Sequence, residues 1–179
     1  MTRIRDLNTF NEVRSAGMAK FQPTRPRIAV GMGTCGAGNG AEGVYHAFAE
    51  AIDRRGFDIG LVRTGCFGFC AEEPLVNVWI PGLPLVILRR VRTDQVQRIL
   101  DEMATKTLPV DLALCKIEAW DHLTAQINYG TGFPELPDWR DVPFFKDKKR
   151  SFCAIAAWSI RATSRNTSPS ADIRRCTRC

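Results

Sequence analysis

Two strand-like segments, each followed by a loop rich in glycine and cysteine, most constrain the fold of this 179-residue chain. The segment RIAVGM, from Arg27, leads into GTCGAGNG, and the segment DIGLVRTG, from Asp58, leads into CFGFCAEEP. Between them, residues 41–55 repeat apolar positions at helical spacing, and Gly56 ends that repeat. A strand, a helix and a second strand in this order predict a parallel pair joined by one crossover. The two loops are therefore expected at the same edge of a sheet.

The segments that follow complete a mixed sheet. LVNVWI and LPLVILRRV are joined by the short link PGL, which predicts an antiparallel hairpin, and RTDQVQRILDEMAT predicts a helix. The order β-α-β-β-β-α over residues 27–106 predicts an α/β domain with the thioredoxin-like arrangement, extending to about residue 110. Residues 1–26 predict an amphipathic helix and a linker. Residues 111–149 predict an irregular connector with anchoring aromatic side chains rather than a second core.

The positive charge of the chain is concentrated near its C-terminal end. The formal net charge is +6, yet residues 146–179 contain nine Lys or Arg and only two Asp. The remaining residues are close to neutral, so no nucleic-acid partner is expected. No apolar run is long enough to cross a membrane, and the N-terminus lacks the pattern of a signal peptide. We therefore expect a cytoplasmic protein without direct membrane insertion.

The first glycine loop also matches the dinucleotide-binding pattern G-x-G-x-x-G, at Gly31, Gly33 and Gly36. That site needs a carboxylate about 20 residues later, at the end of the second strand, to bind the ribose hydroxyls. The second strand instead ends in LVRTGC, and a hairpin follows where a further crossover is required. The context therefore argues against a dinucleotide site in this loop.

Three cysteines are expected to converge at the shared edge. Cys35 lies in the first loop, and Cys66 and Cys70 lie in the second. The glycines around them allow backbone N–H groups to turn toward sulfur (Gly33, Gly36, Gly65 and Gly68). Iron–sulfur clusters gain from such donors, whereas zinc sites usually use Cys-x₂-Cys pairs and four ligands. A third alternative is that these are small apolar cysteines that bind nothing.

The motifs VGMGTCGAGNGA and TGCFGFCAEEPLVNVWIPG resemble the thioredoxin-like [2Fe–2S] ferredoxin family. More narrowly, they resemble the N-terminal domain of NADH-binding flavoprotein subunits, as in the NADH-oxidising subunit of complex I, NAD-linked hydrogenases and formate dehydrogenases. The resemblance covers residues 20–110. It implies a [2Fe–2S] cluster and electron transfer, with FMN, NAD and a [4Fe–4S] cluster in the intact parent subunit only. The implied partners are the other subunits of an NADH-oxidising complex and the chain's own missing flavin domain.

The cysteine pattern departs from that family at the first loop. Cluster-bearing members carry Cys-x₄-Cys in the first loop and Cys-x₃-Cys in the second, and the first pair falls here on Gly31 and Gly36. The candidate metal ligands are therefore Cys35, Cys66 and Cys70, and no fourth ligand is identified. Cys115 could be the fourth ligand only if its strand passed near the other three cysteines. An electron-transfer domain, a docking domain that has lost its cluster and a thiol–disulfide redox protein all remain open. No catalytic residue is expected.

Residues 150–179 lack the patterns that are typical of a folded protein segment. ELPDWRDVPFFKDKKR resembles the segment that leads into the flavin domain of the same subunits, but residues 150–179 show no periodicity. The codons of residues 150–179 can also be read in a shifted frame, in which each new codon takes the third base of one codon and the first two bases of the next. With suitable synonymous third bases, this frame can spell QLLRNCGLVNPRNIEEYIAVGGYTALYAL, which resembles the start of that flavin domain. Our hypothesis is a frameshift near codon 150. Cys153, Cys176 and Cys179 then have no functional meaning.

Overall fold

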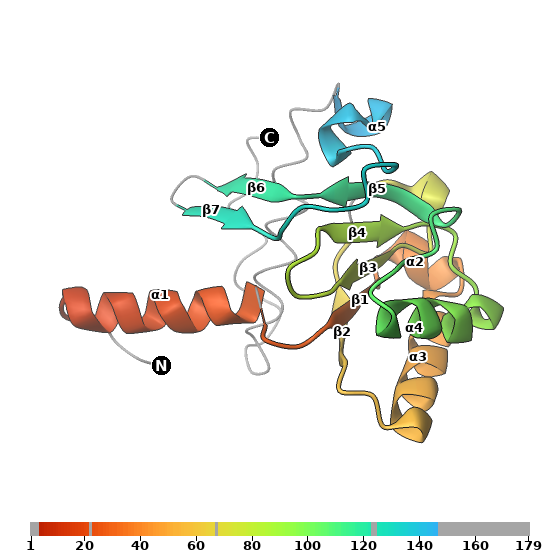
Figure 1. Cartoon of the computed structure of the whole chain (residues 1–179), viewed down its shortest axis with the longest axis horizontal. Helices are drawn as coiled ribbons and strands as arrows, with labels where there is room; N and C mark the ends of the chain where they lie inside the picture. Colours follow the sequence, from red (N-terminus) through yellow and green to blue (C-terminus); the bar gives the residue numbers. More distant parts are fainter. Residues whose placement is uncertain (1–3, 22, 67, 123–124, 147–179) are drawn as a thin grey trace.

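The computed structural model describes residues 4–21, 23–66, 68–122 and 125–146. Its centre is a five-stranded mixed sheet with the strand order β2-β1-β3-β4-β5 (Figure 1). The strands are β1 (Arg27–Gly31), β2 (Gly60–Thr64), β3 (Val76–Trp79), β4 (Leu85–Leu88) and β5 (Ala113–Ile117), with a separate hairpin of β6 (Ala119–His122) and β7 (Ala125–Asn128). The helices are α1 (Leu7–Phe21), α2 (Thr34–Gly38), α3 (Ala41–Arg55), α4 (Val96–Ala104) and α5 (Pro143–Lys146), and the 3-10 turns are η1 (Cys70–Glu72), η2 (Thr93–Gln95) and η3 (Trp139–Asp141).

The topology of the sheet confirms the predicted thioredoxin-like α/β arrangement. Strands β1 and β2 are parallel neighbours, with Arg27 opposite Gly60 and Gly31 opposite Thr64. Strand β3 pairs antiparallel with both β1 and β4, so the predicted hairpin adds to the sheet beside β1. The crossover between β1 and β2 contains the short helix α2 in addition to α3. Helix α2 lies within the glycine loop, where the sequence predicts no helix.

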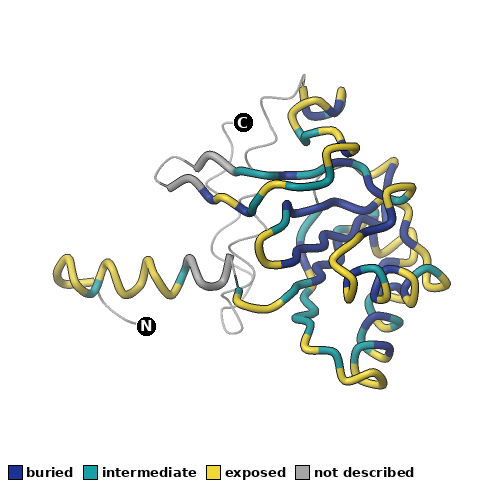
Figure 2. The backbone as a smooth tube through the Cα atoms, viewed as in Figure 1, coloured by how far each residue is buried: buried dark blue, intermediate teal, exposed yellow. Residues whose placement is uncertain are grey.

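The main hydrophobic core lies between the sheet and two helices. Val44 and Phe48 of α3, and Ile99 and Leu100 of α4, are buried against apolar side chains of the sheet. Figure 2 shows the buried central strands, with α3 and α4 turning their other faces to solvent. These inward positions are the ones that the helical periodicity predicts, and that prediction is confirmed.

Residues 111–149 are expected to form an irregular connector with anchoring aromatic side chains rather than a second core; in the part that the structure describes, the aromatic side chains do pack, but an apolar cluster is present as well. Strand β5 extends the sheet beside β4, and the segment after it covers the second face of the sheet. Residues of β3 and β4 are buried on both faces, so the face opposite α3 and α4 also needs apolar cover. Tyr129, Val142 and Phe145 provide it, packing with side chains of the sheet.

Aromatic contacts fix the end of this covering segment. Phe144 stacks on Phe69 with ring centroids 4.1 Å apart, and Phe145 meets Trp139 edge to face with ring centroids 6.1 Å apart. Phe145 is only 7% exposed. These aromatic side chains therefore pack against other residues of this chain, although the resemblance implies a flavin domain after this segment. Whether the segment leads to such a domain stays a prediction.

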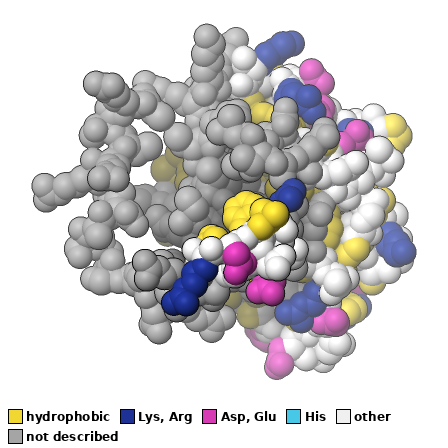
Figure 3. Space-filling view, turned by 90° about the vertical axis from the view of Figure 1, so that its left-hand side faces the viewer, with side chains coloured by type: hydrophobic (Ala, Val, Ile, Leu, Met, Phe, Trp, Pro, Cys, Tyr) yellow, Lys and Arg dark blue, Asp and Glu magenta, His cyan; other side chains and the backbone are white. Residues whose placement is uncertain are grey.

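Helix α1 confirms the predicted N-terminal helix and extends away from the sheet (Figure 1). Its apolar residues Leu7, Phe10 and Val13 are exposed, as is Ile4 before it. Figure 3 looks onto the molecule from this side and shows apolar side chains near the middle of the face. In the described part of the chain, no helix is both long and apolar enough to pass through a membrane. Residues 150–179, which carry the frameshift hypothesis, lie outside the described residues.

Candidate metal centre

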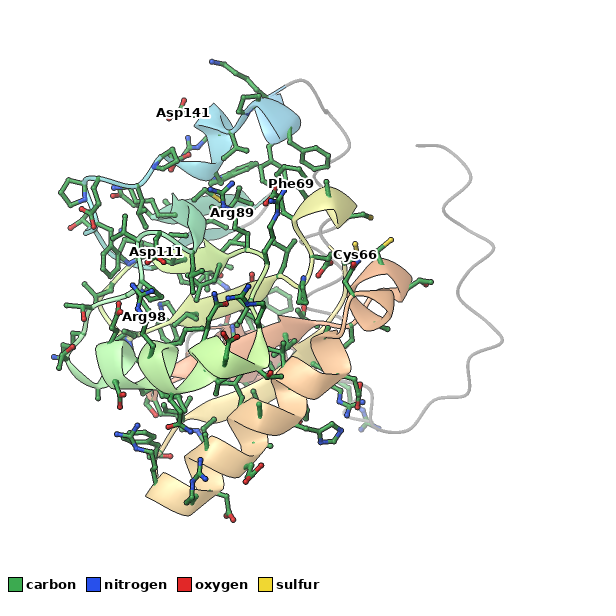
Figure 4. The ribbon with its side chains drawn as sticks, turned by 90° about the vertical axis from the view of Figure 1, so that its right-hand side faces the viewer. Cys66, Phe69, Arg89, Arg98, Asp111 and Asp141 are labelled. Carbon is green, nitrogen blue, oxygen red and sulfur yellow. The ribbon has the colours of Figure 1, made fainter. Side chains whose placement is uncertain are left out.

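The loops that follow β1 and β2 meet at one edge of the sheet, because the two strands are parallel neighbours. Cys35 lies in α2, Cys66 lies two positions after the last residue of β2, and Cys70 opens the 3-10 turn η1. In Figure 4 sulfur atoms gather beside the labelled Cys66, at the end of α2. The three candidate thiols of the sequence are therefore brought together, as their positions after parallel strands predict.

Close packing of the two loops depends on glycine. The Met32 N–H donates to the carbonyl oxygen of Thr64, with an N–O distance of 2.8 Å, and this bond joins the first loop to the second. At Gly33 an added β-carbon would lie 2.6 Å from Cβ of Cys66, which is shorter than a non-bonded contact allows. Gly33 is thus required for the Cys66 loop to lie against α2.

A backbone N–H group points at the Cys66 sulfur. The Gly68 N–H donates to Sγ of Cys66 with an N–S distance of 3.1 Å. Gly68 has a φ of +81°, a left-handed conformation that glycine adopts without steric cost. Burial raises the pKa of the Cys66 thiol, and the Gly68 N–H partly opposes that rise by stabilising the thiolate. The N–H donor that the glycine-rich sequence predicts is therefore present at this cysteine.

The other two thiols interact with each other. A hydrogen bond with the Cys70 side chain is the main cause of a raised pKa at Cys35, and the nearby charges of Cys70, Cys66 and Glu73 add to it. Cys35 is partly exposed and Cys70 is exposed. At neutral pH the Cys35 and Cys66 thiols are therefore largely protonated without a bound cation. A metal that binds them as thiolates must displace protons.

Glu73 is a residue of this site that the sequence reasoning missed. Its side chain is buried, and the residue is 6% exposed. The Cys66 thiol donates to Oε1 of Glu73 with an S–O distance of 3.8 Å, and the Leu75 N–H donates to Oε2 with an N–O distance of 2.7 Å. Burial raises the pKa of this carboxyl, and the two hydrogen bonds oppose the rise. The signal was a carboxylate placed directly before Pro74 and an apolar strand.

The Glu73 carboxylate lies beside the two glycines at which the resemblance places the first-loop cysteines. An added β-carbon at Gly36 would lie 2.5 Å from the carbonyl oxygen of Gly31 and 3.1 Å from Oε2 of Glu73. At Gly31 it would lie 3.3 Å from the carbonyl oxygen of Leu75 and 3.4 Å from Oε2 of Glu73. The space for a thiol at these positions is therefore taken by backbone and by the Glu73 side chain.

Cys115 does not belong to the site. It lies on β5, and β3 and β4 separate that strand from β1. Neighbouring strands lie about 4.8 Å apart, so the separation is roughly 14 Å across the sheet. Its side chain is buried in the second apolar cluster, where burial raises the pKa of the thiol to about 12. Cys153, Cys176 and Cys179 lie outside the described residues.

The three thiols are of the ligand type that a [2Fe–2S] cluster takes, but they are one fewer than the four ligands such a cluster needs. The donor atoms also do not surround a common point. Among the described residues, no three Cys, His, Asp or Glu side chains are grouped as a bound metal ion requires. Ligation therefore needs a change of rotamer, for which the exposure of Cys35 and Cys70 leaves room.

No family model matches the sequence, and no curated protein matches it. Among solved structures, the chain is similar to a thioredoxin-like [2Fe–2S] ferredoxin from Aquifex aeolicus, with 23% identity, 51% of this chain and 92% of that chain covered, and a TM-score of 0.45. A second structure of the wild-type ferredoxin gives 21% identity, coverage of 51% and 98%, and a TM-score of 0.46. A cysteine-to-serine variant of this ferredoxin is 20% identical to the chain, with 51% of this chain and 99% of that chain covered and a TM-score of 0.46. The similarity thus spans about half of this chain.

Proposed function

We propose that residues 27–110 form an electron-transfer domain in which Cys35, Cys66 and Cys70 bind a [2Fe–2S] cluster as thiolates. The observation that carries this proposal is the convergence of these thiols from two loops at one sheet edge. When bound, the cluster would supply one-electron transfer. Gly33 lets the loops approach each other, and the Gly68 N–H donates to the Cys66 sulfur, which stabilises thiolate charge.

We further propose that the parent protein is an NADH-dependent flavoprotein oxidoreductase subunit. The support is the resemblance of VGMGTCGAGNGA, TGCFGFCAEEPLVNVWIPG and the shifted frame of residues 150–179 to that class. Hydride transfer would be the work of FMN in the flavin domain, and this domain would pass single electrons to or from a partner subunit. Reading the DNA from codon 140 tests this. A second frame continuing into glycine-rich FMN and NADH loops supports the parent role, and a frame that closes at once refutes it.

A docking domain that has lost its cluster is the second candidate. The observation that favours it is the absence of a thiol at Gly31 and Gly36, where backbone and Glu73 fill the space. A thiol–disulfide enzyme is disfavoured, because such enzymes depend on a lowered thiol pKa whereas those of Cys35 and Cys66 are raised.

Anaerobic reconstitution with ferrous iron and sulfide separates these functions. We expect about two irons and two acid-labile sulfides per chain, visible absorbance and an electron paramagnetic resonance signal on one-electron reduction. A protein that stays colourless and keeps its circular dichroism would be a docking domain. One that instead reduces insulin disulfides with a dithiol donor would be a thiol–disulfide protein.

A further inference from the structure

We propose that Cys35 and Cys70 form a reversible disulfide that joins the two loops at this edge of the sheet. The bond is an oxidised state of the site in its own right, and it needs no metal ion. It differs from the activity of a thiol–disulfide enzyme, because the crosslink stays within the chain and acts on no substrate. It also consumes two of the three thiols that the proposed cluster would use, so oxidation and cluster binding exclude each other.

The two thiols are already in contact in the folded chain. The Cys35 and Cys70 side chains are hydrogen-bonded to each other, although one lies in α2 and the other opens η1. The loops that carry them are held together at Gly33, which lies directly against Cys66. A disulfide forms only between cysteines that the fold brings close together, and this pair meets that condition across the two loops.

The turn that carries Cys70 is held on both sides. On one side, the ring of Phe69 stacks on Phe144 with centroids 4.1 Å apart and an angle of 2° between the planes. On the other side, the Arg90 guanidinium donates to the Glu72 carboxylate at 3.0 Å, and the Arg90 N–H donates to the Glu72 carbonyl oxygen at 2.9 Å. These contacts fix the position of the thiol, so little order has to be gained when the bond closes.

The third thiol of the site has other partners. Sγ of Cys66 accepts the Gly68 N–H at 3.1 Å, and the Cys66 thiol donates to the Glu73 carboxylate at an S–O distance of 3.8 Å. The contact with Cys70 is the main cause of the raised pKa of Cys35, whereas at Cys66 it ranks behind burial. The geometry therefore favours Cys35 as the partner of Cys70.

The oxidant is a small-molecule disulfide, for which oxidised glutathione is the probe. Cys70 is exposed and Cys35 is partly exposed, so both are open to such a reagent. The Cys70 thiolate attacks one glutathione sulfur, which forms a mixed disulfide and releases one glutathione thiol. The Cys35 thiolate then attacks Sγ of Cys70 and releases the second. Two protein thiols thus lose two electrons and two protons, and one glutathione disulfide is reduced to two thiols.

The test uses the reduced full chain without iron, treated with oxidised glutathione, alkylated and digested with trypsin. Cys35 then lies on the peptide of residues 28–54, and Cys66 and Cys70 share the peptide of residues 64–89. Mass spectrometry should find these two peptides joined by a disulfide. Treatment with a dithiol before alkylation should separate them again.

Two serine variants identify which thiol of the second peptide takes part. Cys66→Ser should keep the joined peptides, because it leaves the proposed pair intact, and Cys70→Ser should lose them. Wild-type peptides that stay separate, with free thiols, bound glutathione or a Cys66–Cys70 bond, would overturn the proposal. So would joined peptides that persist in Cys70→Ser and disappear in Cys66→Ser. Because no iron is present, these outcomes do not depend on whether the chain binds a cluster.

Discussion

Gly33 and Cys66 are in direct contact across the two loops of the site, and a β-carbon at Gly33 would lie 2.6 Å from Cβ of Cys66. Gly33→Ala should therefore push the Cys66 loop away from α2. Overpacking of this kind costs about 1–3 kcal/mol of stability, and the displaced thiol should abolish reconstitution. Urea unfolding and iron content of the same preparation measure both effects.

Gly38→Ala is the matched control for this change, because Gly38 lies in α2, the short helix directly after Gly33, and among the described residues no atom beyond its chain neighbours and its own helix backbone lies within 4 Å of its missing β-carbon. It should bind iron normally and change stability by less than about 1 kcal/mol. Equal iron content in Gly33→Ala and Gly38→Ala would show that the close approach of the loops is not needed for binding.

Tyr129 reports on the second apolar cluster through its titration. Burial raises the pKa of its hydroxyl to about 12, and the nearby Arg27 charge opposes the rise. An unfolded tyrosine titrates near 10, so between about pH 10 and 12 the unfolded state has lost a proton that the folded state keeps. The free energy of unfolding should therefore fall as pH rises through this window, by at most about 1.4 kcal/mol per pH unit.

Tyrosinate absorbance in the wild type and in Tyr129→Phe measures this titration, because Tyr45 is the other tyrosine of the chain. The difference between the two titrations should be a step near pH 12, together with a weaker pH dependence of stability in the variant. A step near pH 10 would instead mean that Tyr129 is accessible to solvent.

Phe145 should contribute strongly to the stability of the domain. It is 7% exposed and packs with Trp139, Phe144 and Phe69 on the face of the sheet opposite α3. Phe145→Ala should lower the free energy of unfolding by about 3–5 kcal/mol, since it removes a buried aromatic side chain. Phe10→Ala, on the exposed face of α1, is the control and should change it by less than about 0.5 kcal/mol. Urea midpoints that agree between the two variants would disprove the second core.

Cys115 should be chemically inert in the folded protein. It is fully buried on β5, and burial raises its pKa to about 12. Cys115→Ser should leave the number of thiols that react with an aromatic disulfide reagent unchanged under native conditions, and lower it by one in denaturant. A native count that drops by one in the variant would place Cys115 at an accessible site.

Much of the fold follows from local sequence patterns. Val44 and Phe48, and Ile99 and Leu100, face the sheet because their spacing matches the helix period. The convergence of the cysteine loops follows from one crossover between two parallel strands, which the strand–helix–strand order predicts. These features depend on residues that are close together in the chain, so they can be predicted from a single sequence.

The remaining features depend on contacts between distant residues. The sequence TCGAG is poor in helix formers, yet it forms α2 where the first loop packs on the second. Strand β5 adds to the sheet because β4 offers an open edge, which no local pattern reveals. In the sequence, Glu73 looks like an ordinary turn residue before Pro74. Only the tertiary structure shows that its carboxylate is buried beside Cys66.

Reconstituting four variants side by side and measuring their iron and acid-labile sulfide tests directly whether the three thiols of the site bind one cluster. Cys35→Ser, Cys66→Ser and Cys70→Ser each remove one proposed ligand, and Cys115→Ser is the control. If the three thiols hold one cluster, each of the first three should contain about tenfold less iron than the wild type, whereas Cys115→Ser should match it. Equal iron in all four variants, or none in the wild type, would show that these three thiols do not hold a cluster.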